Sequence, residues 1–215
     1  MPRSGTTLVE QIISNHSKIT PGDELSFLEM FGSPLAVGET EITSEMLKKV
    51  RNQYLSELKK LSLDRPFITD KMPSNFLYIS LICNALPEAK IIHVKRNPAA
   101  TCWSNYKQHF AEGQGYSYDL FDLVHYYKMY EDLMLFWDEH YPGQIHHLGY
   151  EQLTTDQESE TKKLIQYLDI DWEDACLFPE ENKRYVKTAS NLQVRKKVYK
   201  GSSEEWKKFE KYLDK

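Results

Sequence analysis

The sequence predicts an α/β fold built on a parallel sheet with helices packed on both of its faces. Short apolar segments alternate with longer segments in which apolar residues recur every three or four positions, and this pattern indicates strands alternating with helices. Strands separated by helices pair in parallel, because the crossover through a helix returns the chain to the same end of the sheet. A loop of small residues at Ser4 and Gly5 leads directly into the first helix.

Each element is predicted from its apolar spacing and its boundary residues. Leu8, Ile12 and Ile13 repeat at helical spacing, which predicts a helix from near Thr6 to near Asn15. Further helices are predicted over residues 42–61, 75–86 with Ser74 as the cap, 118–140, 158–168 and 204–213. Strands are predicted over residues 67–69, 90–95 and 144–148.

Length and composition describe a single globular domain over residues 1–215. The chain has 40% hydrophobic and 27% charged residues, with no Gly/Ser-rich linker, internal repeat or low-complexity tract. It contains no apolar run of about 18 residues, so we predict no membrane segment. The three cysteines are widely spaced and odd in number, which favours a reducing compartment and, by default, the cytoplasm.

Charge is distributed unevenly along the chain. The net charge of −5 argues against a nucleic-acid partner. Charged residues from Asp169 to Glu181 are all acidic, whereas those from Lys183 to Lys200 are all basic. Two interpretations of the basic segment stay open, because it could be a solvated tail or a cationic flap over an anionic cofactor.

The segment Arg3-Ser4-Gly5-Thr6-Thr7 has the properties of a phosphate-binding loop. At the start of a helix, unpaired backbone N–H groups and the helix dipole favour an anion. The loop lacks the Gly-Lys-Ser/Thr of nucleotide triphosphatases, and with it the lysine and the Mg²⁺-binding hydroxyl of that chemistry. On its own, so short a motif fits a chance turn equally well.

Several motifs in a fixed order give the chain a more specific resemblance. They are Pro2 to Leu8, Gly22-Asp23-Glu24, Asp70-Lys71 with Pro73, Arg96 with Ser104, Tyr150 to Leu153, and Thr188 to Tyr199. With this set the chain resembles the sulfotransferase superfamily, and within it the tyrosylprotein sulfotransferases and the bacterial sulfotransferases associated with tetratricopeptide repeats. The resemblance implies a three-layer, P-loop-type fold with a central parallel sheet. It also implies transfer of a sulfuryl group from 3′-phosphoadenosine 5′-phosphosulfate (PAPS) to a hydroxyl acceptor, with PAP as the second product.

The resemblance assigns catalytic roles to Glu24, Lys71 and Arg3. Glu24 matches the family's base, a role open to a carboxylate whose pKa burial raises towards the working pH. Lys71 matches a lysine that stabilises the transferring group and the leaving oxygen, and Arg3 matches a residue that points at the sulfuryl oxygens. Simpler interpretations stay open from the sequence alone: Asp23 and Glu24 could cap the next helix, Lys71 could pair with Asp70, and Arg3 could face solvent.

The remaining assignments concern PAPS binding. The loop residues expected to grip the 5′-phosphosulfate are Arg3, Ser4, Gly5, Thr6 and Thr7. Arg96, at a strand end, and Ser104 match the pair that holds the 3′-phosphate. Tyr150 is expected near the adenine or packed in the core, and Ser190 and Lys196 belong to a segment expected to close over the phosphosulfate. No metal is expected, because the histidines show no ligand spacing.

Two other functions share parts of this pattern. A nucleotide kinase would share the phosphate loop and the parallel sheet, and a non-catalytic module that binds PAP or another nucleotide would share the pocket without needing Glu24 and Lys71. The acceptor class stays open among protein tyrosine, carbohydrate and small molecules. Residues Gly22-Asp23-Glu24-Leu25 stand where the tyrosylprotein enzymes have Gly-Glu-Glu-Thr followed by arginine, which puts tyrosine as acceptor in question.

The start of the sequence leads to a further expectation. In the family the phosphate loop follows a buried central strand, whereas only Met1 and Pro2 precede Arg3 here. A parallel sheet without that strand leaves backbone N–H and C=O groups and apolar helix faces uncovered. We therefore expect an N-terminal strand to be missing from this sequence, the natural protein to extend upstream, and the chain as given to associate, for example as a homodimer.

Overall fold

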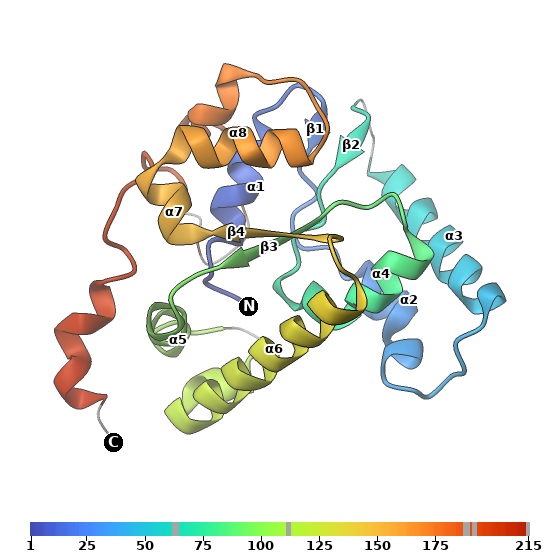
Figure 1. The fold of residues 1–215 in the computed structure, drawn as a ribbon, viewed down its shortest axis with the longest axis horizontal. Helices are drawn as coiled ribbons and strands as arrows, with labels where there is room; N and C mark the ends of the chain where they lie inside the picture. The colour runs from blue at the N-terminus through green and yellow to red at the C-terminus, as the bar shows by residue number, and fades with distance from the viewer. Residues whose placement is uncertain (62–64, 111–112, 187–189, 191–192, 214–215) are drawn as a thin grey trace.

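The structure is a computed structural model that describes residues 1–61, 65–110, 113–186, 190 and 193–213 (Figure 1). Its α-helices are α1 Thr6–Ser14, α2 Phe27–Ala36, α3 Ser44–Lys60, α4 Ile79–Ala85, α5 Pro98–Tyr106, α6 Leu120–His140, α7 Tyr150–Thr155 and α8 Gln157–Tyr167. Its strands are β1 Ile19–Thr20, β2 Phe67–Ile68, β3 Ile91–Lys95 and β4 Ile145–Gly149. Short 3-10 helices cover Pro73–Tyr78, Gly115–Tyr118, Asp174–Leu177, Pro179–Glu181 and Glu205–Tyr212. The chain is therefore an α/β protein, as predicted.

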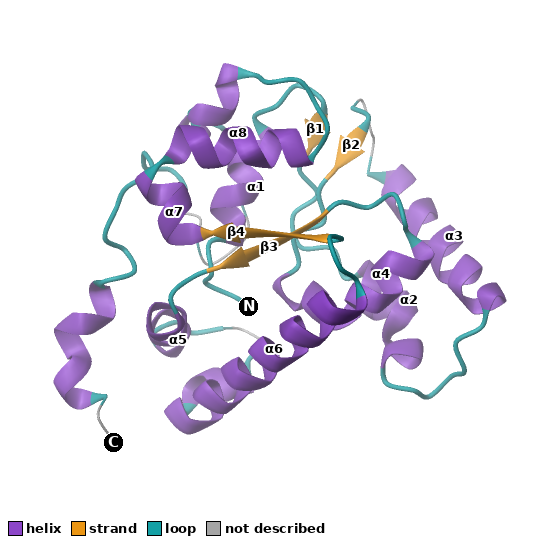
Figure 2. Cartoon of the chain, viewed as in Figure 1, coloured by secondary structure: helices purple, strands orange, loops and turns teal. Residues whose placement is uncertain are grey.

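The four strands form two small parallel sheets surrounded by helices (Figure 2). β1 pairs with β2 through Ile19 opposite Phe67, and β3 pairs with β4 from Ile91 opposite Ile145 to Lys95 opposite Gly149. The parallel pairing is as predicted, but the described residues form two sheets where the sequence predicted one central sheet. Within the part of the chain that the structure describes, no backbone hydrogen bonds of a sheet join β2 to β3, so the prediction of a single sheet is not met there.

An apolar groove separates the two sheets. It has a cavity volume of about 520 Å³ and is lined by β2, by β3 and by one side of α1. Its apolar lining includes Val9, Ile13, Phe67 and Ile92. Within the described residues, β2 and β3 are therefore not paired with each other, and the groove lies between them. Residues 1–5 are all described and form no strand.

The core consists of three clusters that hold the helices against the strands. The first joins α1 to β3, β4 and α8 through buried residues such as Ile12, Val94, Leu148 and Leu164. The second packs α6 against β4 and the 3-10 helix before α4, and the third joins α2, α3 and α4. Because α1 lies in the first cluster, its N-terminus is held at the carboxyl ends of β3 and β4, the edge where α/β proteins bind their ligands.

Most predicted elements are present, and the differences have local causes. The helix predicted over residues 75–86 begins earlier, as the 3-10 helix Pro73–Tyr78, so Ser74 lies inside it and does not cap it. Proline suits a first helical turn because it has no N–H to leave unpaired. The terminal helix predicted over 204–213 is a 3-10 helix over Glu205–Tyr212. β1 was not predicted, because two residues carry no periodic signal.

Among the described residues, the structure has no helix with the length and apolar character that crossing a membrane requires.

Candidate active site

The loop before α1 adopts a conformation that only certain residues tolerate. Gly5 has φ 107°, and a Cβ built there would lie 2.4 Å from Cδ2 of Tyr150, so any other residue would be strained and would collide with the ring. Arg3 has φ 64°, which is uncommon for a residue with a side chain. Ser4 is buried, and its hydroxyl donates a hydrogen bond to the carbonyl of Met1. The loop thus turns sharply into the N-terminus of α1.

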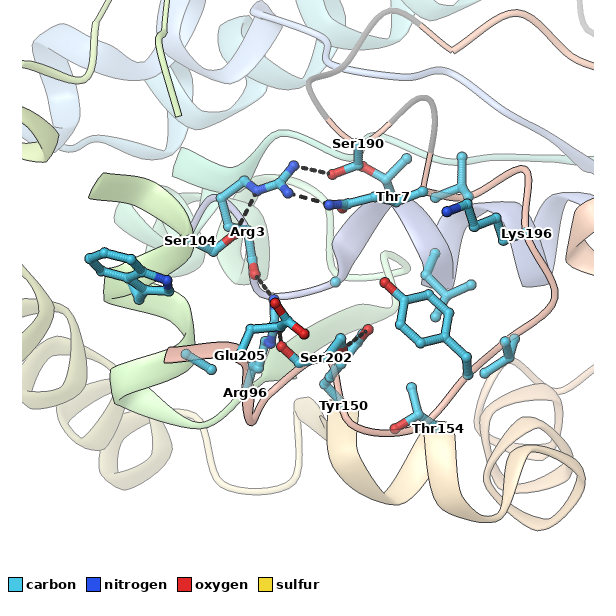
Figure 3. Close-up of a pocket in the computed structure, with 18 of the residues that line it drawn as sticks. Arg3, Thr7, Arg96, Ser104, Tyr150, Thr154, Ser190, Lys196, Ser202 and Glu205 are labelled. Carbon is cyan, nitrogen blue, oxygen red and sulfur yellow. Dashed lines mark hydrogen bonds between the residues drawn. The ribbon is translucent and has the colours of Figure 1, made fainter. Parts of the chain in front are cut away.

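The guanidinium of Arg3 is held by neutral groups from two distant segments (Figure 3). Its Nε donates to Oγ of Ser104 in α5 at 3.0 Å. Its two terminal nitrogens donate to Oγ of Ser190 at 2.7 Å and to Oε1 of Gln193 at 2.9 Å. The structure therefore brings together three residues that the sequence placed on one cofactor: Arg3, Ser104 and Ser190.

Arg96, at the end of β3, is also surrounded by neutral groups. Its guanidinium lies 4.7 Å from the centre of the Tyr150 ring, a cation–π contact. It donates to Oγ of Ser203 at 3.0 Å, to the carbonyl of Ser202 at 2.7 Å and to the carbonyl of Arg3 at 3.0 Å. Within the described residues, neither Arg96 nor Arg3 forms an ion pair with a carboxylate.

These arginines lie in a cavity of about 230 Å³ whose lining is strongly cationic. The lining contains Arg3, Arg96, Lys107, Lys196 and Lys197, whereas Glu205 is the single carboxylate among its described residues. Burial, and next the charge of Arg96, lower the pKa of Arg3. A pocket that holds several cations without matching carboxylates is suited to bind an anion.

Most of the residues predicted to bind the cofactor line this cavity, which we call the anion pocket. They are Arg3, Gly5, Thr7, Arg96, Ser104, Tyr150, Ser190 and Lys196. Two predicted residues do not line it: Ser4 is buried beneath the loop, and Thr6 lines the apolar groove instead. Tyr150 begins α7, and its hydroxyl lies 2.8 Å from Oγ of Ser202. Its ring lines the pocket and also packs against the first core cluster, so both interpretations of Tyr150 apply.

Glu24 and Lys71 form an ion pair outside the lining of the anion pocket. Nζ of Lys71 donates to Oε1 of Glu24 at 2.6 Å, and the Lys71 side chain is 7% exposed while that of Glu24 is 40% exposed. Neither simpler interpretation holds. Asp70 accepts a hydrogen bond from the hydroxyl of Tyr54 at 2.9 Å, and α2 begins after Ser26 without any side-chain cap.

Three further aromatic residues, which the sequence did not indicate, line the anion pocket. Trp103 from α5, and Tyr199 and Trp206 from the end of the chain, line the cavity. The rings of Trp103 and Phe209 lie 4.7 Å apart, and the terminal 3-10 helix packs against α5. The amphipathic pattern of residues 204–213 was the one feature of the sequence that indicated packing of this segment. An amphipathic pattern predicts a buried face but not the element that covers it.

The part of the chain that the structure describes has no group of three or more histidine, cysteine or acidic side chains placed to hold a metal. His93 and His147 contact each other through their Nδ1 atoms at 2.9 Å, and His147 also contacts Oδ1 of Asp138 at 2.8 Å. The ring of His146 is not part of this contact and stacks on the ring of Tyr167.

The sequence model of the sulfotransferase family matches residues 1–174 of this chain. The chain belongs to the sulfotransferase family. It is 40% identical over 230 aligned positions to an "Uncharacterized protein" of Aquifex aeolicus (strain VF5), covering 99% of this chain and 30% of that protein. It is 26% identical to "Protein-tyrosine sulfotransferase" of Drosophila melanogaster, covering 84% of this chain and 39% of that protein. This sulfotransferase thus spans about a third of the length of these two relatives.

Solved structures give the sulfotransferase the same fold at low sequence identity. The sulfotransferase domain from the Synechococcus PCC 7002 olefin synthase has a TM-score of 0.70 and 19% identity, covering 96% of this chain and 84% of that one. The sulfotransferase domain from the curacin biosynthetic pathway has a TM-score of 0.66 and 14% identity, covering 96% and 87%. The fold is therefore that of sulfotransferase domains.

Proposed function

We propose that this sulfotransferase uses PAPS as its donor and transfers the sulfuryl group to a hydroxyl acceptor. The observation that carries the proposal is the pair of arginines, Arg3 and Arg96, which lie half-buried side by side with only neutral hydrogen-bond partners among the described residues. Burying cations without a counterion is costly. A dianionic ligand in the pocket would supply the missing negative charge.

The residues of the anion pocket fit the parts of PAPS. Arg96 and the hydroxyl of Ser104 offer donors for a terminal phosphate, which suits the 3′-phosphate. Arg3, which donates to Ser104 at 3.0 Å, offers its guanidinium to the sulfuryl oxygens. The start of α1, near Gly5 and Thr7, offers backbone N–H groups to the 5′-phosphosulfate. The rings of Tyr150, Trp103 and Trp206 offer flat apolar surfaces to the adenine. PAPS, when bound, supplies an activated sulfuryl group whose S–O bond to phosphate breaks during transfer.

The acceptor side of the reaction requires a base and a stabilising cation. In our proposal Glu24 takes the proton of the acceptor hydroxyl while the acceptor oxygen forms its bond to sulfur, and the leaving oxygen departs with the bonding electron pair as part of PAP. Lys71, which holds Glu24 at 2.6 Å, orients that carboxylate and offers positive charge to the transferring group. A ligand that occupies the pocket would bring the sulfuryl group towards this pair, and apo geometries commonly tighten on binding.

The acceptor class remains a choice among a protein tyrosine, a carbohydrate and a small molecule. The similarity to the Drosophila protein favours tyrosine, whereas Asp23 and Leu25 depart from the tyrosylprotein pattern. A panel containing a tyrosine peptide, a phenol and a hexose, incubated with PAPS and read by mass spectrometry, would separate the classes by a mass increase of one sulfuryl group.

The competing functions make different predictions for binding. Calorimetry should show that PAP binds at least about tenfold more tightly than AMP, which corresponds to about 1.4 kcal/mol, because AMP lacks the 3′-phosphate. Equal affinities would count against the proposal. Turnover in the presence of EDTA would argue against a kinase, and PAP binding without turnover on any acceptor would favour a non-catalytic module.

We also propose that the two small sheets belong to one central layer of a P-loop-type, three-layer fold, joined by a further strand in the apolar groove. β2 and β3 each pair on one side only among the described residues, and the groove between them is lined with apolar side chains.

The cellular setting is also a proposal. Cys83, Cys102 and Cys176 are all free, in keeping with our proposal of a cytoplasmic protein. The net charge of −5 speaks against a nucleic-acid partner. A homodimer is the association we propose, and light scattering at several concentrations would test it.

A further inference from the structure

Arg184 lies outside the anion pocket, in a buried cluster of charges. Its Nη2 donates to Oε2 of Glu10 at 2.6 Å and its Nη1 to Oδ1 of Asp23 at 2.7 Å. Its Nε donates to Oε1 of Gln11. The Arg184 side chain is 11% exposed and that of Glu10 is 1% exposed. Every part of this guanidinium fork therefore has a protein acceptor, and two of the three acceptors are carboxylates.

The cluster holds the turn that carries Glu24. The second oxygen of Glu10 accepts hydrogen bonds from the backbone N–H of Asp23 at 3.1 Å and from the hydroxyl of Thr69 at 2.6 Å. The carbonyl of Asp23 accepts from the backbone N–H of Lys71 at 2.8 Å. Asp23 itself has φ 57°, a left-handed conformation that needs support from its surroundings. The residues on either side of the Glu24–Lys71 pair are thus tied to Glu10 and Arg184.

The chain segment around Arg184 also reaches the anion pocket. Asn182 donates to Oγ of Ser14 in α1 at 3.0 Å, and further along the same segment Ser190 and Gln193 bind the guanidinium of Arg3. One stretch of chain therefore contacts both the turn before Glu24 and the arginine that faces the proposed donor site.

We propose that Arg184 is a positioning residue, which holds Glu24 in place for proton removal by bridging Glu10 and Asp23. This inference rests on the proposed function, in which Glu24 is the base. Arg184 acts through the turn and touches neither acceptor nor donor. Its loss should leave the anion pocket intact, because the partners of Arg3 and Arg96 are separate from those of Arg184.

The test compares Arg184→Gln with Arg184→Lys and with the control Arg51→Gln. Arg51 forms a more exposed arginine–carboxylate pair with Glu88, with two hydrogen bonds of 2.8 and 2.6 Å, and lines neither the anion pocket nor the charge cluster of Arg184. Assays use PAPS and whichever member of the acceptor panel reacts. We expect Arg184→Gln to lower kcat by about 10- to 100-fold, the scale of a small misplacement of a reacting group, with KM for PAPS and Kd for PAP unchanged. Arg184→Lys should recover part of the rate.

A structural role without positioning would give a different pattern. The double variant Glu10→Gln with Arg184→Gln removes the unpaired buried charge while leaving the turn without its bridge. Continued loss of kcat in the double variant supports positioning, whereas full recovery of kcat would overturn it.

Hydrogen exchange makes the inference testable apart from activity. In Arg184→Gln, amides over residues 20–25 should exchange faster than in the parent and in Arg51→Gln, and unchanged exchange there would overturn the proposal. The variant Glu24→Gln separates the two failures. If it retains full turnover, the assignment of the base fails; if it is inactive while Arg184→Gln is fully active, only the role of Arg184 fails.

Discussion

Arginines with opposite kinds of partner occur near α1, one group at the loop before the helix and the other on Glu10 and Gln11 within it. Arg3 and Arg96 contact hydroxyls, an amide oxygen, backbone carbonyls and the ring of Tyr150. Arg184 contacts the carboxylates of Glu10 and Asp23. In the first group the positive charge is left uncompensated by the described residues, and in the second it is neutralised by the protein itself.

The difference indicates which arginines serve a ligand and which serve the fold. A buried ion pair is expensive to break, because removal of one partner leaves the other as an uncompensated charge. Arg184 therefore stabilises a local arrangement of the chain. A half-buried arginine surrounded by neutral acceptors keeps most of its charge available, so its field attracts an anion. All of these residues are arginines, and only their partners distinguish them.

The largest expected effect concerns Glu24, the proposed base, which the arginine that serves the fold holds in place. We expect Glu24→Gln to lower turnover by roughly 100-fold or more, the usual contribution of a general base, while the affinity for PAP changes little because Glu24 lies outside the anion pocket. Steady-state kinetics and calorimetry on the same preparation would check both parts. Full turnover in the variant would move the base elsewhere.

The next effect tests the arginines with neutral partners. Arg96→Ala should weaken PAP binding by about 10- to 100-fold, since hydrogen bonds to a charged group contribute about 1.5–3 kcal/mol, and should abolish the preference for PAP over AMP. Calorimetry provides the measurement, with Arg51→Ala as the control. If Arg96→Ala binds PAP like the parent, the pocket does not use its uncompensated charge.

A smaller effect compares the two groups through their response to salt. Affinity for PAP should fall several-fold when NaCl is raised from about 50 mM to about 500 mM, because an anion attracted to a partly open cationic pocket is screened. The loss of melting temperature in Arg184→Gln relative to the parent should stay nearly constant over this range, since a buried pair is screened much less. If the affinity for PAP and the loss of melting temperature in Arg184→Gln respond equally to salt, the two groups of arginines do not differ in their exposure to screening.

The smallest effect concerns Asp70, a half-buried carboxylate that forms no ion pair with any residue the structure describes. Burial raises the pKa of Asp70 from 3.8 to about 6, so between those values the folded protein binds a proton that the unfolded chain does not. The contribution of Asp70 to stability should therefore improve as the pH falls from 7 towards 4. Thermal melts should show Asp70→Asn more stable than the parent at pH 7 by a few degrees, with the gap closing at pH 4. If the difference in melting temperature between Asp70→Asn and the parent is the same at pH 7 and pH 4, the pKa of Asp70 is not raised in the folded protein.

Local chemistry accounts for what the sequence predicted well. α1, α3, α6 and α8 follow from apolar spacing, and β3 from a run of β-branched residues. Gly5 in the loop follows from the need for a positive φ and for space beside Tyr150. The family resemblance located Arg3, Ser104 and Arg96, which lie together in the structure although up to 101 residues separate them. It could not show that Ser4 and Thr6 face away from the pocket.

The sequence by itself determined the α/β class, the positions of most helices and the family, because these depend on short-range periodicity and on ordered motifs. Tertiary structure alone decided which arginines are neutralised, since Arg184 and Glu10 are 174 residues apart. It also decided that Lys71 pairs with Glu24 and not with its neighbour Asp70. A charged side chain takes its role from the groups that surround it after folding, and those groups come from distant parts of the chain.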